Sequence, residues 1–531
     1  MQKYFNITGI CYPEKHYMVN LERRLKEIQK LIDRGDYFVI NRARQYGKTT
    51  TLWALKQYLQ KDYEVIFLSF QRLTQDDFKN EETFTLAFLD IFLQRLYRLK
   101  RLKDYDQNIL STLEQYTNNS KSSIRLRQMF HTISQLCETA PKPVVLIIDE
   151  VDSASNNQVF LDFLSILRDY YLDKEEANIF QSVILAGVYD IKNLRLKIRP
   201  EEEHKYNSPW NIAADFPIEM SFSILDITQM LQEYEKDHQT GMNTKDLATQ
   251  IYNYTAGYPY MVSYLCKYLD DQSKKKENST KKAIWTKEGL LEAVKDLVNR
   301  PNTLSDDMVK KLSDYPELKQ IMKDILFCGA EYPYNLLNST IRMAAMFGYI
   351  KERENHISVA NRIMETQLYN FFLSEELVDS KSYKAATLVK NQFIKGNTLD
   401  MELILKKFTE HFTEIYGDQK ENFLEENGRR FFLLYLKPII NGVGNYYIEA
   451  QTRNQKRTDI IIDYQGNQYI IEMKIWRGEE YNQRGEEQLT EYLEYYHLNK
   501  GYLLSFNFNK NKTTGIKKIT HKGKTIIEAI I

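Results

Sequence analysis

Three ionisable residues near the C-terminal end have the types and spacing of a metal-assisted hydrolytic site. Asp459 lies in RTDIIID, and Glu472 and Lys474 occupy alternate positions in YIIEMKIW. Alternate residues of a strand share a face, and a hairpin between these two segments would bring Asp459 beside Glu472. Two carboxylates that hold a divalent cation, with a lysine beside them, suit cleavage of a phosphodiester bond.

The sequence around Glu472 and Lys474 favours a functional interpretation of the pair. Both residues interrupt a strongly apolar run, where a buried charge is costly unless it is paired or bound to metal. The alternative is an ordinary Glu–Lys pair on a solvent-facing strand.

A second group of residues, near the N-terminal end, has the pattern of a phosphate-binding loop. The segment 41–50 reads NRARQYGKTT, and its Gly47, Lys48 and Thr49 fit the last three places of GxxxxGK[ST]. In such a loop the backbone N–H groups surround the phosphates, the lysine neutralises them and the hydroxyl binds Mg²⁺. Arg42 takes the place of the first glycine, where it is either tolerated beside the loop or contacts phosphate.

An acidic partner for this loop follows a later apolar run, VVLIIDE. Asp149 can complete a Mg²⁺ shell, and Glu150 can polarise an attacking water. The alternative is that Thr49 only caps a helix and that both acids are ordinary loop residues. The expected nucleotide-site residues are Arg44, Gly47, Lys48, Thr49, Thr50, Asp149 and Pro259, with Thr49 and Asp149 as metal ligands and Glu150 as catalytic residue.

The elements that would position these residues alternate between strand and helix in the N-terminal part. The phosphate-binding loop follows an apolar strand and precedes a helical pattern, which is the order that such a loop needs. Strands alternating with helices predict a doubly wound α/β domain with a parallel sheet over about 1–225. The expected strands are 37–41, 64–70, 143–149 and 182–187.

The rest of the chain predicts further domains. We expect a helical lid over 226–305, a winged-helix-like module with a hairpin over 306–375, a helical linker over 376–415 and an α/β domain over 416–531. The last domain should contain strands at 446–451, 458–464, 468–476 and 501–506 and a helix at 485–498. The basic tail Lys510–Lys524 is either a flexible solvated segment or a phosphate contact.

The N-terminal 300 residues resemble the AAA-ATPase-like proteins of bacteria, close to the STAND-type P-loop ATPases. The arginine-rich loop NRARQYGKTT and the strand VLIIDE carry this resemblance. It implies a γ-phosphate sensor at Tyr189 and Asp190 in VILAGVYD, and a lid turn near the adenine at Gly257 and Pro259 in TAGYPY. It also implies a winged helix after the lid.

The C-terminal part, about 420–515, resembles the PD-(D/E)xK nuclease superfamily. The strand with Asp459, the ExK strand and the following helix carry this resemblance, although Thr458 stands where the family name has proline. EEQLTEYL supplies Gln488 at the place of a QxxxY motif, so Gln488 is a further candidate catalytic residue. The family also implies another acid, for which Glu449 and Glu425 are the candidates.

Composition places limits on the whole chain. The 531 residues carry 72 basic and 72 acidic side chains, so net charge gives no argument for nucleic-acid binding. The four cysteines have no paired spacing, which fits a reducing cytoplasm. No signal peptide and no apolar stretch of about 20 residues is present, so we expect no membrane.

These observations predict an ATP-binding and hydrolysing protein that controls a Mg²⁺-dependent nuclease. We expect DNA as its partner, and defence against foreign DNA suits the architecture by analogy. Assembly into a homo-oligomer and activation by a protein trigger are further possibilities that the sequence leaves open. The alternative is a nucleotide-sensing scaffold whose nuclease-like domain binds but does not cleave, and a third hypothesis is an ATPase with a DNA-binding winged helix.

Overall fold

The strands expected around the phosphate-binding loop form a parallel sheet in the computed structural model. Among the described residues its order is β1-β4-β3-β2. Both central strands are buried along their whole length, as expected for a parallel sheet covered on both faces. The strands are β1 (Phe38–Asn41), β2 (Glu64–Ser69), β3 (Val144–Asp149) and β4 (Ser182–Gly187).

The described part of the chain is residues 2–531 with several gaps. The gaps are 100, 119–123, 156, 174–178, 189–208, 276–283, 328–331, 378–389, 417–424, 441–443, 449–459, 477–478 and 510–511.

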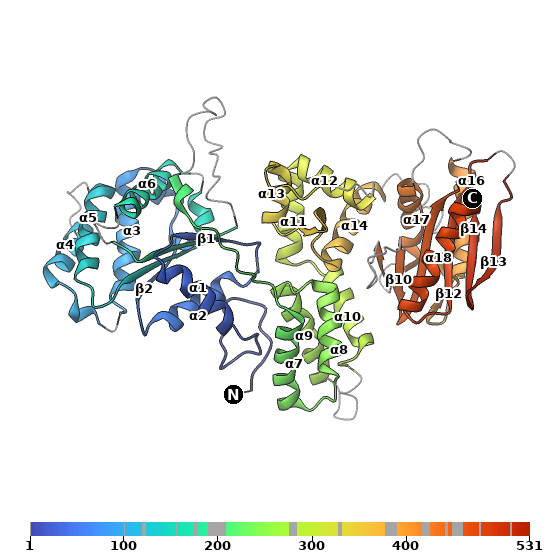
Figure 1. Ribbon diagram of the computed structural model, residues 1–531, viewed down its shortest axis with the longest axis horizontal. Helices are drawn as coiled ribbons and strands as arrows, with labels where there is room; N and C mark the ends of the chain where they lie inside the picture. Colours follow the sequence, from blue (N-terminus) through green and yellow to red (C-terminus); the bar gives the residue numbers. More distant parts are fainter. Residues whose placement is uncertain are drawn as a thin grey trace. The chain divides into compact units, whose positions relative to one another are not determined.

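Helices surround this first sheet (Figure 1). Leu25, Ile28 and Ile32 recur at helical spacing in α1 and are buried, so the apolar stripe of this helix faces the core. Aromatic rings fill the space between β2, α3 and α6, where Phe88 and Phe163 have ring centroids 5.0 Å apart. The helices are α1 (Glu22–Asp33), α2 (Lys48–Leu59), α3 (Glu81–Leu96), α4 (Gln107–Asn118), α5 (Leu126–Glu138) and α6 (Gln158–Leu172).

A helical region with one hairpin follows the first sheet. GYIKERENHISV forms the predicted hairpin, from β5 (Ile350–Arg353) and β6 (His356–Val359). The helices are α7 (Ile224–His238), α8 (Thr244–Thr255), α9 (Pro259–Lys275), α10 (Lys287–Asn299), α11 (Thr303–Asp314), α12 (Pro316–Phe327), α13 (Ser339–Met346) and α14 (Arg362–Leu377).

The described residues divide into two units. The first unit contains Met1–His238, Gly257–Lys267 and Met346–Gly348. The second contains Gln239–Ala256, Tyr268–Ala345 and Tyr349–Ile531.

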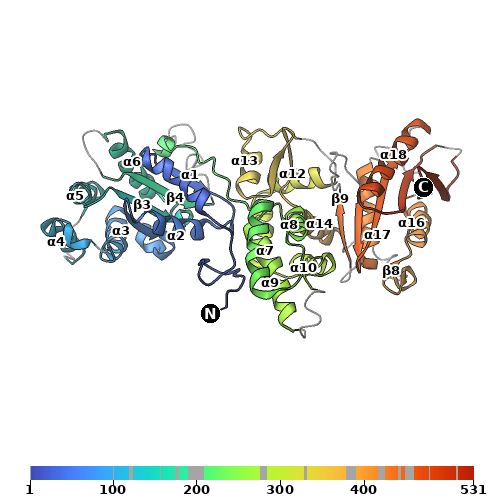
Figure 2. The same ribbon diagram turned by 60° about the horizontal axis from the view of Figure 1, so that its bottom comes forward.

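The C-terminal part is built on a mixed sheet of order β13-β14-β12-β11-β10-β9 (Figure 2). The pairs β9–β10, β10–β11 and β13–β14 are antiparallel, whereas β11–β12 and β12–β14 are parallel. The elements are α16 (Met401–Tyr416), α17 (Glu425–Ile440), β9 (Gly444–Ile448), β10 (Ile460–Tyr464), β11 (Asn467–Ile475), α18 (Glu479–Tyr495), β12 (Lys500–Phe506), β13 (Gly515–His521) and β14 (Lys524–Ile530).

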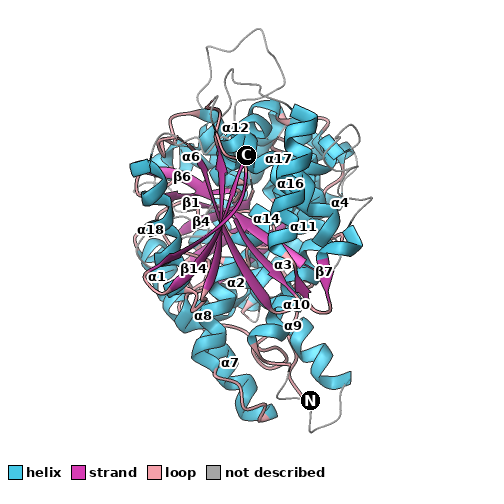
Figure 3. Ribbon diagram, turned by 90° about the vertical axis from the view of Figure 1, so that its right-hand side faces the viewer, coloured by secondary structure: helices cyan, strands magenta, loops and turns pink. Residues whose placement is uncertain are grey.

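Helices cover both faces of this second sheet, and Figure 3 draws helices in cyan and strands in magenta. A Cβ added to Gly485 of α18 would lie 3.2 Å from Cγ of Lys474, so α18 packs on the face that carries Lys474. The opposite face carries Phe506, whose ring is 5.5 Å from that of Phe412 in α16. Gly428 of α17 also lies against Phe506.

Two segments differ from the sequence prediction. The predicted helical linker contains a small hairpin of β7 (Ile394–Lys395) and β8 (Thr398–Leu399). The basic tail is not a flexible segment where it is described, because 515–521 form the edge strand β13. Its exposed lysines suit a sheet edge, since charged side chains there discourage pairing with another chain.

No helix in the described ranges is long and apolar enough to cross a bilayer.

Candidate nucleotide and nuclease sites

The phosphate-binding loop connects β1 to α2 with the expected geometry. Gly47 has a φ of 78°, in the left-handed region that favours glycine, and α2 begins at Lys48. The Nζ of Lys48 donates hydrogen bonds to the carbonyl oxygens of Arg42 at 2.8 Å and Ala43 at 3.0 Å. The lysine is therefore held inside the loop, where its charge can meet a phosphate.

Arg42 points away from the loop interior. Its guanidinium donates hydrogen bonds to the carbonyl oxygens of Phe216, at 3.3 Å, and Ile218, at 3.0 Å. The guanidinium also lies 5.4 Å from the centre of the Phe216 ring. Arg42 is absent from the residues with positive φ, so its backbone does not require glycine. Of the two roles left open by the sequence, the structure favours an anchor beside the loop over a phosphate contact.

The two expected magnesium ligands of this loop lie side by side. The hydroxyl of Thr49 donates a 2.7 Å hydrogen bond to Oδ2 of Asp149, which is 2% exposed. Burial raises the pKa of Asp149, while the bonds from Thr49 and from the backbone of Glu150 lower it. A hydroxyl and a carboxylate at this spacing match the ligand pair that P-loop proteins use for Mg²⁺.

Glu150 directly follows Asp149 in a strained conformation. Its φ of 56° lies in the left-handed region, which is uncommon for a residue with a side chain. Burial, and next the charge of Asp149, raise the pKa of Glu150. A carboxylate with a raised pKa is the better base, which suits the predicted polarisation of water.

The remaining predicted nucleotide residues occupy different positions around the loop. Arg44 is exposed, and its carbonyl oxygen accepts a hydrogen bond from the hydroxyl of Tyr258. The hydroxyl of Thr50 accepts a 3.2 Å hydrogen bond from the backbone N–H of Cys11, so it holds the N-terminal segment. Pro259 begins α9, and its neighbour Tyr258 makes the contact with the loop.

Asp152 is a site residue that the sequence analysis missed. Its Oδ2 accepts a 2.7 Å hydrogen bond from the backbone of Val188. Burial lowers the pKa of Lys48, and Asp152 is the first of the acids that oppose this shift. A Cβ on Gly187 would lie 2.6 Å from Oδ1 of Asp152, so the glycine permits this approach. The sequence signal that could have identified Asp152 is its place as the third acid of the segment DEVD.

The predicted sensor residues cannot be placed. Tyr189 and Asp190 lie outside the described residues. The described part of β4 ends at Gly187, beside Asn41 at the end of β1.

Glu472 and Lys474 lie together on β11, as the sequence predicts. The Nζ of Lys474 is 2.8 Å from Oε1 of Glu472. Glu472 is fully buried at 0% exposure, and the Lys474 side chain is 14% exposed. A carboxylate in that position is costly without a cation nearby, so the ordinary solvent-facing pair is excluded.

The other acids proposed for this site are beyond what the structure describes. Asp459 and Glu449 lie outside the described residues, as does the side chain of Glu425 at the start of α17. The described register of β10 and β11 reaches Ile460, which pairs with Ile471.

The predicted QxxxY residues contact each other on α18. Nε2 of Gln488 donates a 2.7 Å hydrogen bond to the hydroxyl of Tyr492, which is buried. α18 covers the face of Glu472, so this pair belongs to the layer above the candidate site.

Two further buried polar residues share that face of the sheet. Ser505 pairs with Lys474 in the parallel register of β11 and β12, and its hydroxyl donates a 2.7 Å hydrogen bond to Glu528 of β14. Ser505 is 0% and Glu528 1% exposed. Neither residue was predicted from the sequence, although Glu528 interrupts an apolar run as Glu472 does.

No group of three or more His, Cys, Asp or Glu side chains able to hold a metal occurs among the residues that the structure describes.

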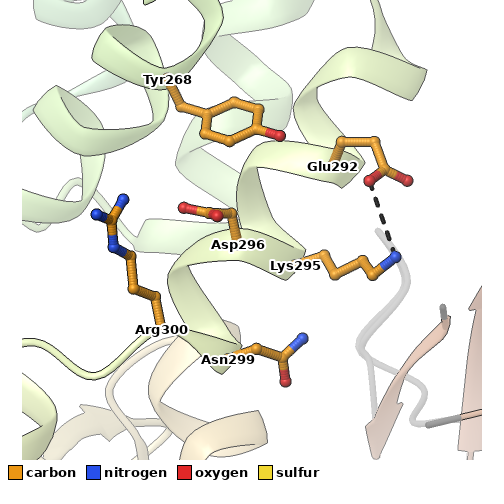
Figure 4. Close-up of a pocket in the computed structure, with 6 residues that line it drawn as sticks. All are labelled: Tyr268, Glu292, Lys295, Asp296, Asn299 and Arg300. Atoms are coloured by element: carbon orange, nitrogen blue, oxygen red, sulfur yellow. Dashed lines mark ion pairs between the residues drawn. The ribbon is translucent and has the colours of Figure 1, made fainter. Parts of the chain in front are cut away.

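A polar pocket of about 300 Å³, lined by none of the predicted site residues, lies on α9 and α10 (Figure 4). Asp296 and Glu292 border it, and burial, followed by these two acids, raises the pKa of Tyr268 in its wall. The pocket is lined by Tyr268, Glu292, Lys295, Asp296, Asn299 and Arg300.

Comparison with known families agrees with this geometry. The AAA-like domain family matches residues 12–375, which is more than half of the chain, so the chain belongs to this family. The PD-(D/E)XK nuclease superfamily matches residues 443–519, and the C-terminal part is a PD-(D/E)XK nuclease domain. Both predicted family assignments are confirmed, whereas the bacterial source and the STAND type stay predictions.

Several solved structures match the chain at low sequence identity. The Walker-type ATPase PABY2304 of Pyrococcus abyssi is 14% identical over 68% of this chain and 99% of that chain, with a TM-score of 0.46. The Aeropyrum pernix ORC1 protein, solved in complex with DNA, is 9% identical over 68% and 94%, with a TM-score of 0.29. The Thermotoga maritima RuvB Holliday junction branch migration motor is 13% identical over 64% and 92%, with a TM-score of 0.30. None of the curated proteins matches the chain.

Proposed function

We propose that this chain binds and hydrolyses ATP and thereby controls a magnesium-dependent nuclease that acts on DNA. The observation that carries the nuclease part is the buried Glu472–Lys474 pair, 2.8 Å apart on one face of β11. Such a pair in a PD-(D/E)XK domain supports a hydrolytic role over a purely structural one.

The register of the sheet supports Asp459 as the second acid. Ile460 pairs with Ile471, so continuing the ladder by one residue would set Asp459 opposite Glu472. These two carboxylates, with Glu449 or Glu425, would hold a magnesium ion. Bound magnesium would polarise the phosphate and lower the pKa of a coordinated water. Lys474 would offset the negative charge that develops on the phosphate. Gln488, on α18, would help to orient the reacting groups.

The nucleotide site supports the ATPase part of the proposal. Lys48 is positioned to neutralise phosphates, and Thr49 and Asp149 offer paired oxygens to the magnesium of a bound nucleotide. Glu150, with its raised pKa, would accept a proton from the attacking water.

The nuclease proposal is tested with purified full-length protein, magnesium, and single- and double-stranded DNA and RNA. Lys474→Ala and Asp459→Ala should each abolish cleavage. Lys406→Ala and Glu494→Ala, at exposed positions of α16 and α18, are the matched controls and should cleave like the wild type. Inactivity of the wild type on every substrate would instead support the nucleotide-sensing scaffold.

Control of the nuclease by nucleotide is a separate part of the proposal. ATP binding at Lys48 and Thr49 would alter the helical lid and the winged-helix-like region, and so expose or assemble the nuclease site. Lys48→Ala should remove the dependence of cleavage on ATP, whereas the exposed control Lys61→Ala should retain it. Unchanged nucleotide dependence in Lys48→Ala would rule out this control.

Defence against foreign DNA is the biological role that fits a nucleotide-controlled nuclease. Expression of the wild type in a bacterial host should lower the yield of infecting phage, and Lys474→Ala should not. Equal phage yields with both proteins would argue against this role.

A further inference from the structure

Four side chains from separate segments of the second unit meet at the far end of β10. The hydroxyl of Tyr254 in α8 donates a 3.4 Å hydrogen bond to Oδ2 of Asp463 in β10. Arg362, the first residue of α14, lies close enough to Tyr496 after α18 that its charge opposes the rise that burial causes in the pKa of Tyr496. Its guanidinium also lies 6.0 Å from the centre of the Tyr254 ring. We refer to these four residues as the Tyr254 cluster.

The Tyr254 cluster lies on the face of the sheet that carries the candidate nuclease residues. Asp463 pairs with Gln468 in the ladder between β10 and β11. Side chains alternate along a strand, so Gln468 and Glu472 share one face and Asp463 shares it with them. Asp463 is 5% exposed, and a buried carboxylate needs hydrogen-bond donors around it. The cluster therefore fixes β10 from helices of the AAA-like region.

The chain that follows Tyr254 leads directly to the phosphate-binding loop. α8 ends at Thr255, and the turn then passes through Gly257, whose φ is 75°. A Cβ at Gly257 would lie 2.0 Å from the carbonyl oxygen of Phe222, so the turn is tightly packed. The next residue, Tyr258, donates its hydroxyl hydrogen bond to the carbonyl of Arg44.

The two ends of this segment belong to different units. Tyr254 is part of the second unit and Tyr258 of the first, with the boundary between Ala256 and Gly257. One end thus contacts a strand of the nuclease sheet, and the other end contacts the phosphate-binding loop, each within its own unit.

We propose that Tyr254 and Arg362 are positioning residues for the nuclease, in which Tyr254 holds β10 through Asp463 and Arg362 lies against the Tyr254 ring, and that the segment 254–258 links β10 to the phosphate-binding loop. The proposal rests on the proposed function, because β10 matters for cleavage only if Asp459, directly before it, binds metal. Bound nucleotide would act on the nuclease site through these residues.

The test is hydrogen exchange, followed by mass spectrometry, of peptides covering 460–464 in the full-length protein. The variants are Tyr254→Phe, which removes only the hydroxyl, and Tyr252→Phe, a matched control on the same helix. Each is measured alone and with magnesium and a non-hydrolysable ATP analogue, whose binding is measured in parallel. Thermal unfolding checks that both variants are folded.

We expect Tyr254→Phe alone to exchange in 460–464 about fivefold faster than the wild type, the factor expected from one typical hydrogen bond. Tyr252→Phe should match the wild type. The nucleotide analogue should change this exchange in the wild type and in Tyr252→Phe, but not in Tyr254→Phe. In cleavage assays Tyr254→Phe should raise the magnesium concentration needed for half-maximal rate.

Two results would overturn the proposal. Equal exchange in Tyr254→Phe and the wild type would remove the positioning role, and a nucleotide response that survives in Tyr254→Phe would remove the link. If the analogue does not bind at all, the ATP part of the proposed function and the link both fail, while the nucleotide-free comparison still decides the positioning role.

Discussion

The hydroxyl of Thr49 and the carboxylate of Asp149 are 2.7 Å apart although the residues are 100 positions apart in the chain. Their proximity follows from the parallel sheet, because the carboxyl ends of β1 and β3 lie at the same edge. Under the proposed function, both side chains would bind the Mg²⁺ ion that accompanies a nucleotide.

Removing the Thr49 hydroxyl should weaken ATP binding in a magnesium-dependent way. Thr49→Val should bind ATP about tenfold more weakly in the presence of magnesium, since hydrogen bonds and ligands to charged groups contribute about 1.5–3 kcal/mol. Thr49→Ser keeps the oxygen and should bind like the wild type. Titration with a fluorescent ATP analogue, with magnesium and with EDTA, measures the difference. An equal loss under both conditions would speak against a ligand role.

Placing glycine at position 42, where the phosphate-binding motif usually has it, should destabilise the fold. Arg42→Gly loses two hydrogen bonds to the carbonyls of Phe216 and Ile218 and gains backbone freedom in the unfolded chain. The expected loss of stability is about 1–3 kcal/mol, measured as a lower Tm. Arg44→Gly, at an exposed position, should cost less. A higher Tm for Arg42→Gly would contradict the anchoring role.

The effect of Asp149 on stability should depend on pH. Burial raises its pKa in the folded protein, so the folded state binds the proton more tightly than the unfolded state. Its stabilising contribution is complete below the unfolded pKa, about 4, and is lost as pH rises through the raised folded value. Without metal, Asp149→Asn should therefore raise Tm at neutral pH and less at about pH 4. A gain in Tm that shrinks as pH rises would contradict this sign.

Breaking the Glu472–Lys474 pair should cost more than replacing both partners. Lys474→Met removes the ammonium group that lies 2.8 Å from the buried carboxylate of Glu472. The free energy of unfolding should therefore fall by about 3–5 kcal/mol. The double variant Glu472→Leu with Lys474→Met places apolar side chains in an apolar layer and should recover most of that loss. Thermal unfolding of wild type, both single variants and the double variant measures the coupling. Additive losses would show that the pair is not buried as described.

Local patterns in the sequence sufficed for the parts of the sites that lie on one element. Gly47, Lys48 and Thr49 were predictable because a strand, a turn and a helix follow one another directly. Glu472 and Lys474 were predictable because alternate positions of a strand share a face. The register of β10 and β11 also follows from the short turn between them.

Contacts between distant segments could not be predicted. Tyr254 and Asp463 are 209 positions apart, and Arg42 reaches carbonyls more than 170 positions away. Backbone carbonyls have no sequence signature, so the hydrogen bonds that hold the Arg42 side chain could not be predicted. The strand β13 was missed because its exposed lysines hide the alternation of apolar and polar residues that marks a half-buried strand.

The first unit is assembled from three separated stretches of chain, the last of which ends at Gly348. A polypeptide emerging from the ribosome would thus have to be synthesised beyond that point before the unit could close. Any fragment that stops near His238, however well it retains the parallel sheet, would leave apolar surface uncovered and invite aggregation.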